Sequence, residues 1–188
     1  MNSRITAAIK SHLEAADKIA ALAPEIERAA SALAGVIASG GKILVCGNGG
    51  SAADSQHIAG ELVGRFKKER RAIAAIALST DTSILTCLSN DYGFDRVFER
   101  QVEALGRKGD ALIAISTSGA SVNVLNAAKR ARELGLFTLG LLGRGGGLIK
   151  PACDVALVIE GTDTPRIQEM HLLCAHMICE LIEDSAAS

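Results

Sequence analysis

The chain has 188 residues, of which 48% are apolar, and its formal net charge is −1 because acidic and basic residues nearly balance. A length of this order suits one domain with a single hydrophobic core. The mixed charges form no basic stripe, which argues against nucleic-acid binding. No apolar run is long enough to span a bilayer, so we expect no membrane association.

The aromatic and cysteine content indicates the kind of core and the cellular compartment. With no Trp, one Tyr and four Phe, the core must be built from Ala, Leu, Ile and Val, as in layered folds with buried parallel strands. The five cysteines lack CxxC spacing, and their odd number argues against a complete disulfide framework. The N-terminus has no apolar segment of the signal-peptide kind. We expect a soluble protein of the cytoplasm, where thiols stay reduced.

Two helices are predicted at the start of the chain. Residues 3 to about 20 carry apolar side chains at helical spacing. A second helical stretch follows Pro24 and runs to about residue 39, where Gly40-Gly41 is a natural stop. The pattern then changes, because residues 42–46 form a short continuous apolar run that is typical of a strand buried on both faces.

Strands and helices alternate over the rest of the chain. Four more strands are predicted at residues 72–78, 111–115, 137–142 and 155–159. Helices are predicted at about 53–66, 95–105, 122–134 and 166–183. This alternation indicates βαβ units and a parallel sheet. We predict one domain over residues 1–188, a flavodoxin-like α/β three-layer sandwich with a five-stranded parallel sheet, and N-terminal helices (1–40) that serve packing or oligomerisation.

The turn after the first predicted strand, Cys46-Gly-Asn-Gly-Gly-Ser51, is rich in glycine. Glycines allow the backbone to approach a ligand closely, and the N–H groups of the following helix attract anions. Gly47, Gly49 and Ala52 also match a loose dinucleotide-binding pattern. The acidic residue which that pattern requires is poorly matched, since Asp81 lies too far along. A purely structural tight turn is the other alternative.

The loop after the third strand, Ile115-Ser-Thr-Ser-Gly-Ala-Ser121, is more informative. It places four hydroxyl groups where ligands bind in open α/β sheets, at the carboxyl end of a strand and the start of a helix. Hydroxyls and helix N–H groups hold a phosphate without Lys or Arg. One Ser would suit an ordinary N-cap, but four hydroxyls in six residues favour a phosphate site. A GxxxxGK[ST] motif is missing, which disfavours a nucleoside triphosphatase.

Two predicted helices carry further candidates. His57 and Glu61 are spaced i,i+4, so both address the same point. Gln168 and His176 are about 12 Å apart along the last helix and about 80° around it, so they reach one ligand only by leaning toward each other or toward a partner surface. His171 lies on a different side. Each has a plainer interpretation, because a helical His is often a hydrogen-bonded core group and a lone Glu is usually solvated.

Together these segments resemble the sugar isomerase (SIS) domain and, within it, the bacterial phosphoheptose isomerases. The resemblance covers nearly the whole chain. It is carried most specifically by Cys46-Gly-Asn-Gly-Gly-Ser-Ala-Ala-Asp54, Gln56-His-Ile-Ala-Gly-Glu61, Ser89-Asn-Asp-Tyr-Gly-Phe94, Ile115-Ser-Thr-Ser-Gly119 and Arg166-Ile-Gln-Glu-Met-His171. It implies a homotetramer with active sites at subunit contacts. The implied reaction converts sedoheptulose 7-phosphate to D-glycero-D-manno-heptose 7-phosphate, for the lipopolysaccharide core or related glycans.

The resemblance also implies roles for individual residues. Glu61 is implied as the catalytic base and His176 as the acid. In relatives that bind zinc, the ligand positions match His57, Glu61, Gln168 and His176. Substrate contacts are implied for Asn48, Gly49, Gly50, Ser51, Glu61, Asn90, Asp91, Ser116, Thr117, Ser118, Ser121 and Gln168. Pro165 replaces an acidic residue that some relatives have before the Arg-Ile-Gln motif, so no substrate contact is carried over to it.

These residue types suit the isomerisation of a ketose to an aldose. A base moves a proton between neighbouring carbons through an enediol, while an acid or electrophile manages charge on the oxygens. Zinc would polarise the carbonyl, although a Glu that ligates zinc is a weaker base.

Two other functions remain as alternatives. One is a non-catalytic SIS protein that binds the replication initiator, but such proteins typically lack the carboxylate and the late histidine that this chain keeps at Glu61 and His176. The other is a sugar-phosphate sensor, which usually carries an additional domain.

Overall fold

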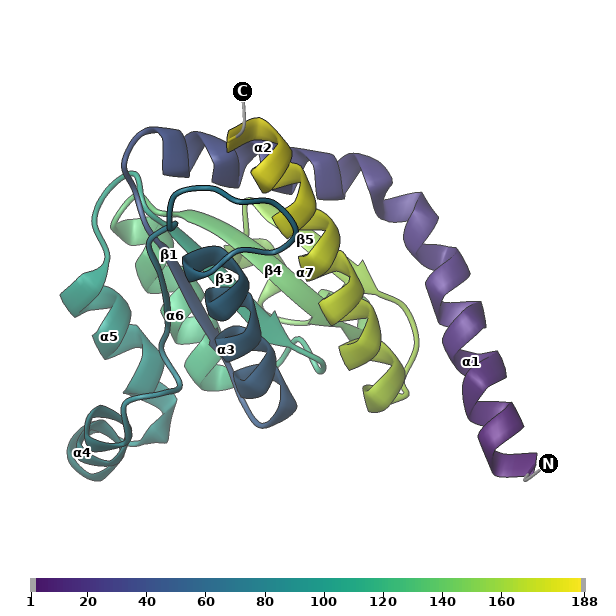
Figure 1. Cartoon of the computed structure of the whole chain (residues 1–188). Helices are drawn as coiled ribbons and strands as arrows, with labels where there is room; N and C mark the ends of the chain where they lie inside the picture. Colours follow the sequence, from purple (N-terminus) through teal and green to yellow (C-terminus); the bar gives the residue numbers. More distant parts are fainter. Residues whose placement is uncertain (1–2, 187–188) are drawn as a thin grey trace.

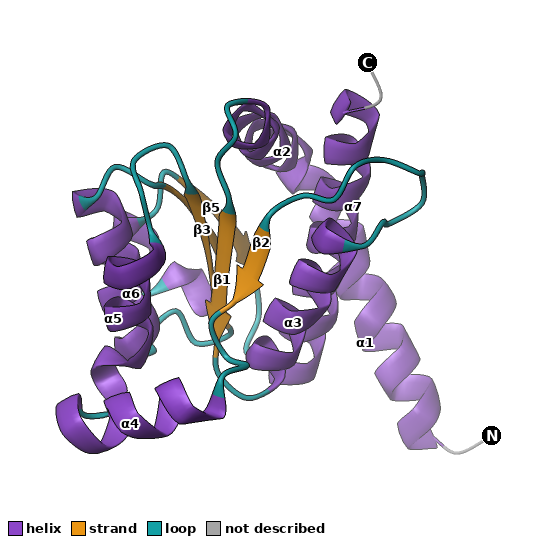
Figure 2. Ribbon diagram, turned by 60° about the vertical axis from the view of Figure 1, so that its left-hand side comes forward, coloured by secondary structure: helices purple, strands orange, loops and turns teal. Residues whose placement is uncertain are grey.

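The apolar runs of the sequence assemble into one parallel sheet with strand order β2-β1-β3-β4-β5 (Figure 1 and Figure 2). The computed structural model describes residues 3–186. The strands are β1 (Ile43–Gly47), β2 (Ala75–Ala77), β3 (Ala111–Ser116), β4 (Phe137–Gly143) and β5 (Val155–Ile159). All neighbouring pairs run parallel, so the carboxyl ends of the strands share one edge of the sheet. The predicted five-stranded parallel sheet is confirmed.

Helices cover both faces of the sheet, which confirms the three-layer prediction (Figure 2). Their bounds are α1 (Ser3–Ile19), α2 (Ala23–Ala38), α3 (Gly50–Val63), α4 (Thr82–Tyr92), α5 (Val97–Leu105), α6 (Val122–Glu133) and α7 (Thr164–Ala186). Short 3-10 turns occupy Ala20–Leu22 (η1), Phe94–Arg96 (η2), Arg144–Gly146 (η3) and Lys150–Ala152 (η4). On one face, α2, α3 and α7 enclose Val45, Ile113 and Leu141. On the other, α5 and α6 enclose Leu44, Leu112 and Leu142.

The structure corrects two predicted boundaries and adds one helix that was not predicted. Helix α3 begins at Gly50 instead of residue 53, because the Gly-rich turn itself forms the first turn of the helix. Strand β2 covers only Ala75–Ala77 instead of 72–78, since it is an edge strand that pairs with β1 alone. Helix α4 is not predicted at all. None of its residues is fully buried, and its contact with the core is limited to the partly buried Leu85 and Leu88, which make too short a pattern to indicate a helix. Asp81 caps it by accepting from the Ile84 amide at 2.9 Å.

Helix α1 extends from the body of the molecule beside α7 (Figure 1). Two contacts fix it there: His12 Nδ1 lies 2.7 Å from a Glu169 carboxylate oxygen, and Arg166 donates to the carbonyl of Ala8 at 2.6 Å. Its apolar side chains are nevertheless largely exposed, among them Ile5, Ile9 and Leu13. Within residues 3–186, none of the helices combines the length and the apolarity that crossing a membrane requires.

Candidate active site

Helices α3 and α7 bring three ionisable side chains together on one face of the sheet. His57 Nε2 lies 2.8 Å from His176 Nε2 and 3.3 Å from Glu61 Oε1. One ligand atom from each residue lies within 4.8 Å of the other two. Two imidazole nitrogens and a carboxylate oxygen are a donor set that zinc enzymes use. These three residues, hereafter the His–Glu–His cluster, therefore fit a divalent metal ion.

The surroundings of the cluster favour a neutral His176. Burial lowers the pKa of His176, and the neighbouring His57 and Lys67 lower it further, while Glu61 acts in the opposite direction. The ring of Phe66 packs on the His176 ring with 5.1 Å between centroids. A neutral imidazole is the form that ligates a metal or accepts a proton.

Gln168 contacts the beginning of α3, away from His57. A Cβ atom at Gly50 would lie 2.0 Å from Gln168 Nε2, so the amide occupies space that any other residue would fill. The contacts Gly50–Gln168 and His57–His176 show that α3 and α7 run in the same direction. Gln168 and His176 are eight residues apart on α7, and their partners Gly50 and His57 are seven residues apart on α3. Both contacts are therefore made within one chain. The role of Gln168 as a zinc ligand stays a prediction.

The hydroxyl groups of the loop after β3 cluster with one another. Ser116 Oγ lies 3.0 Å from Ser121 Oγ and 3.3 Å from Ser118 Oγ, and the amide of Ala120 donates to Ser118 Oγ at 3.2 Å. Ser121 is the N-cap of α6, yet its side chain makes no capping hydrogen bond. Amide groups in the first turn of α6 have no partner within the helix. This arrangement favours an anion cradle over a simple N-cap, with Thr117 partly buried beside it.

A second glycine-rich loop, which was not predicted, supports this cradle. A Cβ at Gly147 would lie 2.4 Å from the carbonyl oxygen of Gly119, so the two backbones touch. Arg144, at the start of the same loop, has a positive φ of 50°, which is rare for a residue with a side chain. The run Gly145-Gly146-Gly147 was the available signal.

The Gly-rich turn is tied to the cradle by an amide pair. Asn48 Nδ2 donates to Asn123 Oδ1 at 2.8 Å, and Asn123 Nδ2 donates back to Asn48 Oδ1 at 2.9 Å. Asn48 is a predicted substrate contact, whereas Asn123 was not predicted, because a single Asn in the first turn of a helix is a weak signal. Ser51, another predicted substrate contact, is 3% exposed. Gly49 has a φ of 56° at the N-cap of α3, and no atom beyond its neighbours in the chain lies within 4 Å of the position that a side chain would take there.

Asn90 and Asp91 lie at the end of α4, which lies near the carboxyl ends of β1 and β2 (Figure 2). Both are exposed. Asn90 Nδ2 donates to Asp91 Oδ1 at 2.8 Å, and Cys87 Sγ lies 3.5 Å from Asp91 Oδ2. Because α4 packs mainly on α5 and η2, the recorded contacts do not join these two residues to the cluster or to the cradle.

Comparison with known proteins identifies the class to which this fold and site belong. Residues 6–143 match the SIS domain family. The match spans more than half of the 188-residue chain, so the chain belongs to the SIS domain family.

Within that family the similarity is to phosphoheptose isomerases. The chain is 54% identical to the phosphoheptose isomerase of Helicobacter hepaticus, covering 97% of this chain and 93% of that protein. It is 55% identical to the enzyme of Aliarcobacter butzleri, covering 98% of both. The solved structure of phosphoheptose isomerase from Neisseria gonorrhoeae superposes with a TM-score of 0.92 at 44% identity, over 97% of this chain and 98% of that one. The resemblance stated from the sequence is confirmed.

Proposed function

We propose that this chain is a phosphoheptose isomerase that converts sedoheptulose 7-phosphate to D-glycero-D-manno-heptose 7-phosphate through an enediol. The observation that carries the proposal is the convergence of Glu61 with His57 and His176 in a chain similar over its full length to phosphoheptose isomerases. The product would serve the lipopolysaccharide core or a related glycan in the cytoplasm. The non-catalytic alternative, a protein that binds the replication initiator, has no support among these relatives.

Each residue has a distinct task in the proposed reaction. The hydroxyls of Ser116, Thr117, Ser118 and Ser121 and the first amides of α6 hold the phosphate. The carboxylate of Glu61 removes a proton from the carbon next to the carbonyl and returns it to the neighbouring carbon. The neutral imidazole of His176 donates its N–H proton to the carbonyl oxygen on which charge develops and takes a proton back from the neighbouring hydroxyl, so that the protons on the two oxygens balance. Asn48 and the backbone of Gly49 and Gly50 orient the hydroxyl chain, together with Ser51, Asn90, Asp91 and Gln168.

Zinc is the proposed cofactor, held by His57, Glu61 and His176; because Gln168 of the same chain lies at Gly50, a fourth ligand of this kind would come from Gln168 of a neighbouring subunit. The first three offer their donor atoms within 4.8 Å of one another, which supports the site. When bound, zinc would polarise the substrate carbonyl and orient the neighbouring hydroxyls.

The dimensions of α3 support an active site shared between subunits of a homotetramer. Glu61 follows Gly50 by eleven residues, which is about 16 Å along a helix. Gly50 adjoins Asn48, whose amide pairs with the start of α6 and so with the phosphate cradle. This separation between the cradle and Glu61 of the same chain supports a site to which two subunits contribute. The exposed apolar face of α1 supports oligomerisation through residues 1–40 of a single SIS domain (1–188).

The deciding experiment is an assay of the purified protein with sedoheptulose 7-phosphate. We expect an aldose 7-phosphate product, detected by NMR, and incorporation of solvent deuterium at the carbon that exchanges its proton in the enediol. Sedoheptulose without its phosphate is the matched control substrate and should react poorly. An inactive protein, with and without added zinc, would overturn the proposed function.

A further inference from the structure

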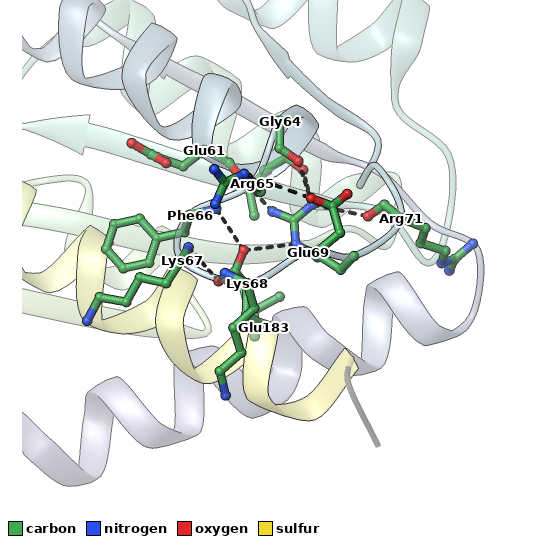
Figure 3. A network of polar contacts seen from close by, with 12 residues as sticks. Glu61, Gly64, Arg65, Phe66, Lys67, Lys68, Glu69, Arg71 and Glu183 are labelled. Atoms are coloured by element: carbon green, nitrogen blue, oxygen red, sulfur yellow. Dashed lines mark hydrogen bonds and ion pairs between the residues drawn. The ribbon is translucent and has the colours of Figure 1, made fainter.

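The loop that follows α3 is fixed to α7 by a buried carboxylate. We call residues 64–71 the anchor loop (Figure 3). Glu183 is 2% exposed and accepts hydrogen bonds from the backbone amides of Phe66, Lys67 and Lys68 at 2.7, 2.8 and 2.9 Å. Burial alone would raise the pKa of Glu183, but these amides and the nearby Arg70 together lower it. The carboxylate is therefore charged while it holds three consecutive peptide groups.

Arg70 connects this carboxylate to the end of α3. Its side chain is 5% exposed, and its Nε atom lies 3.3 Å from Glu183 Oε1. The guanidinium donates to the carbonyls of Glu61 at 2.7 Å, Leu62 at 2.9 Å and Gly64 at 3.1 Å. Carbonyl groups in the last turn of a helix lack partners within the helix. Arg70 donates hydrogen bonds to these carbonyls, and one of the carbonyls belongs to Glu61, the proposed catalytic base.

The anchor loop also contacts the proposed acid. The Phe66 ring packs on His176 with 5.1 Å between centroids and 32° between planes, and the amide of Phe66 is one of the three that Glu183 binds. A phenylalanine on one face of the imidazole limits the rotation of the ring, which then directs Nε2 toward His57. Glu183 thus acts on both members of the proposed acid–base pair, on Glu61 through Arg70 and on His176 through Phe66.

The chemistry of the pair argues for positioning rather than for stability. A buried ion pair loses the solvation of both charges, and apolar residues of similar volume often stabilise a fold equally well. Directional hydrogen bonds to seven backbone groups, the carbonyl of Arg71 among them, instead hold those groups in one arrangement. We propose that Glu183, Arg70 and Phe66 are positioning residues that hold Glu61 and His176 in the geometry of the isomerisation. The inference rests on the proposed function.

The first test removes the contact between the Phe66 and His176 rings and leaves the hydrogen bonds of Glu183 to the backbone in place. Phe66→Leu should lower kcat about tenfold with KM nearly unchanged, because misplacement of a catalytic group by a fraction of an ångström affects the chemical step more than binding. Phe66→Tyr, which keeps the ring, should restore kcat. Phe137→Leu is the matched control, since Phe137 is also partly buried and packs on the same core. Equal kcat in Phe66→Leu and Phe137→Leu would overturn the role of Phe66.

The second test does not depend on activity. Hydrogen exchange at the amides of residues 66–68 should accelerate at least about tenfold in Glu183→Gln, because an amide side chain cannot accept all three hydrogen bonds. Glu180→Gln is the control, as Glu180 lies on the same helix and only binds the exposed Lys67 ammonium at 2.8 Å. Unchanged exchange in Glu183→Gln would overturn the proposed role of Glu183 in holding the anchor loop. An active wild type with an unaffected Phe66→Leu would overturn this inference alone, whereas an inactive wild type would overturn the proposed function.

Discussion

Glu61 combines the two properties that a base for carbon acids needs. Its side chain is 22% exposed, which shields it from bulk water, and the contact of Oε1 with His57 at 3.3 Å keeps it oriented. The i,i+4 spacing of His57 and Glu61 made this pair predictable from the sequence. The approach of His176 does not follow from spacing, because it depends on how α7 is aligned with α3; only the resemblance to the family implied it.

Replacing the proposed base should separate chemistry from binding. In Glu61→Gln we expect kcat to fall by at least about 100-fold, since general-base catalysis contributes factors of this size, while substrate still binds. Initial rates and calorimetric titration with sedoheptulose 7-phosphate measure the two effects. Glu133→Gln, on the exposed side of α6, should behave as wild type. Undiminished turnover in Glu61→Gln would exclude this residue as the base.

His171 gives the protein a specific sensitivity to mild acid. Burial lowers the pKa of His171 to about 4, and the carbonyl of Leu142 offsets only part of this effect. Between the ordinary pKa of about 6.5 and this value, the unfolded chain binds more protons than the folded one. The free energy of unfolding therefore decreases as the pH falls through that window, by a total on the order of 3 kcal/mol.

Urea denaturation at a series of pH values between 7 and 4 tests this dependence. His171→Gln should be less stable at pH 7 but should lose less stability than wild type over the same interval, because its side chain does not titrate. Identical pH slopes for the two proteins would contradict the assignment to His171.

At the scale of elements, the sequence predicted the hydroxyl-rich loop of the proposed phosphate cradle but not the loops that support it. The four hydroxyls after a buried strand indicated where an anion would bind, because that position is defined by residues close in sequence. Its support from Gly147 and from the Asn48–Asn123 pair joins loops far apart in sequence. No local pattern reports such a contact. Helix α4 was not predicted because only a short part of it packs on the core, at the partly buried Leu85 and Leu88.

The cradle should control affinity for the phosphate. Ser118→Ala combined with Ser121→Ala removes two hydroxyls of the cluster, and each hydrogen bond to a charged group is worth about 1.5–3 kcal/mol. We expect KM to rise by at least about tenfold, with a smaller effect on kcat. Ser31→Ala, exposed on α2, is the control. If the double variant retained the wild-type KM, the loop would not be the phosphate site.

At the scale of the whole molecule, the sequence was sufficient to predict the three-layer architecture, because the spacing of apolar runs alone encodes a parallel sheet with crossover helices. The oligomer is harder to deduce. Its support lies in the exposed Ile5, Ile9 and Leu13 of α1 and in the length of α3. Light scattering should give the mass of four subunits.

Mixing two defective chains tests whether the active site is shared. When Glu61→Gln and the double variant of Ser118 and Ser121 are co-expressed, about a quarter of the sites in mixed oligomers should combine an intact cradle with an intact Glu61. Activity at low substrate should then exceed that of either variant alone. The control is a mixture of the two variants that were expressed separately, in which the oligomers do not exchange subunits. A mixture no more active than its better component would place the cradle and Glu61 of one site in the same chain.

The contact between Gly50 and Gln168 has a consequence for how this sequence tolerates change. A methyl group at position 50 would displace the flexible end of Gln168 and not the backbone. An alanine there should leave folding and abundance almost untouched while moving the amide away from the Gly-rich turn. In a mutational library sorted for expression, position 50 would therefore accept alanine. In the same library sorted for heptose production, glycine would persist, and a replacement would survive only together with a shorter side chain at position 168.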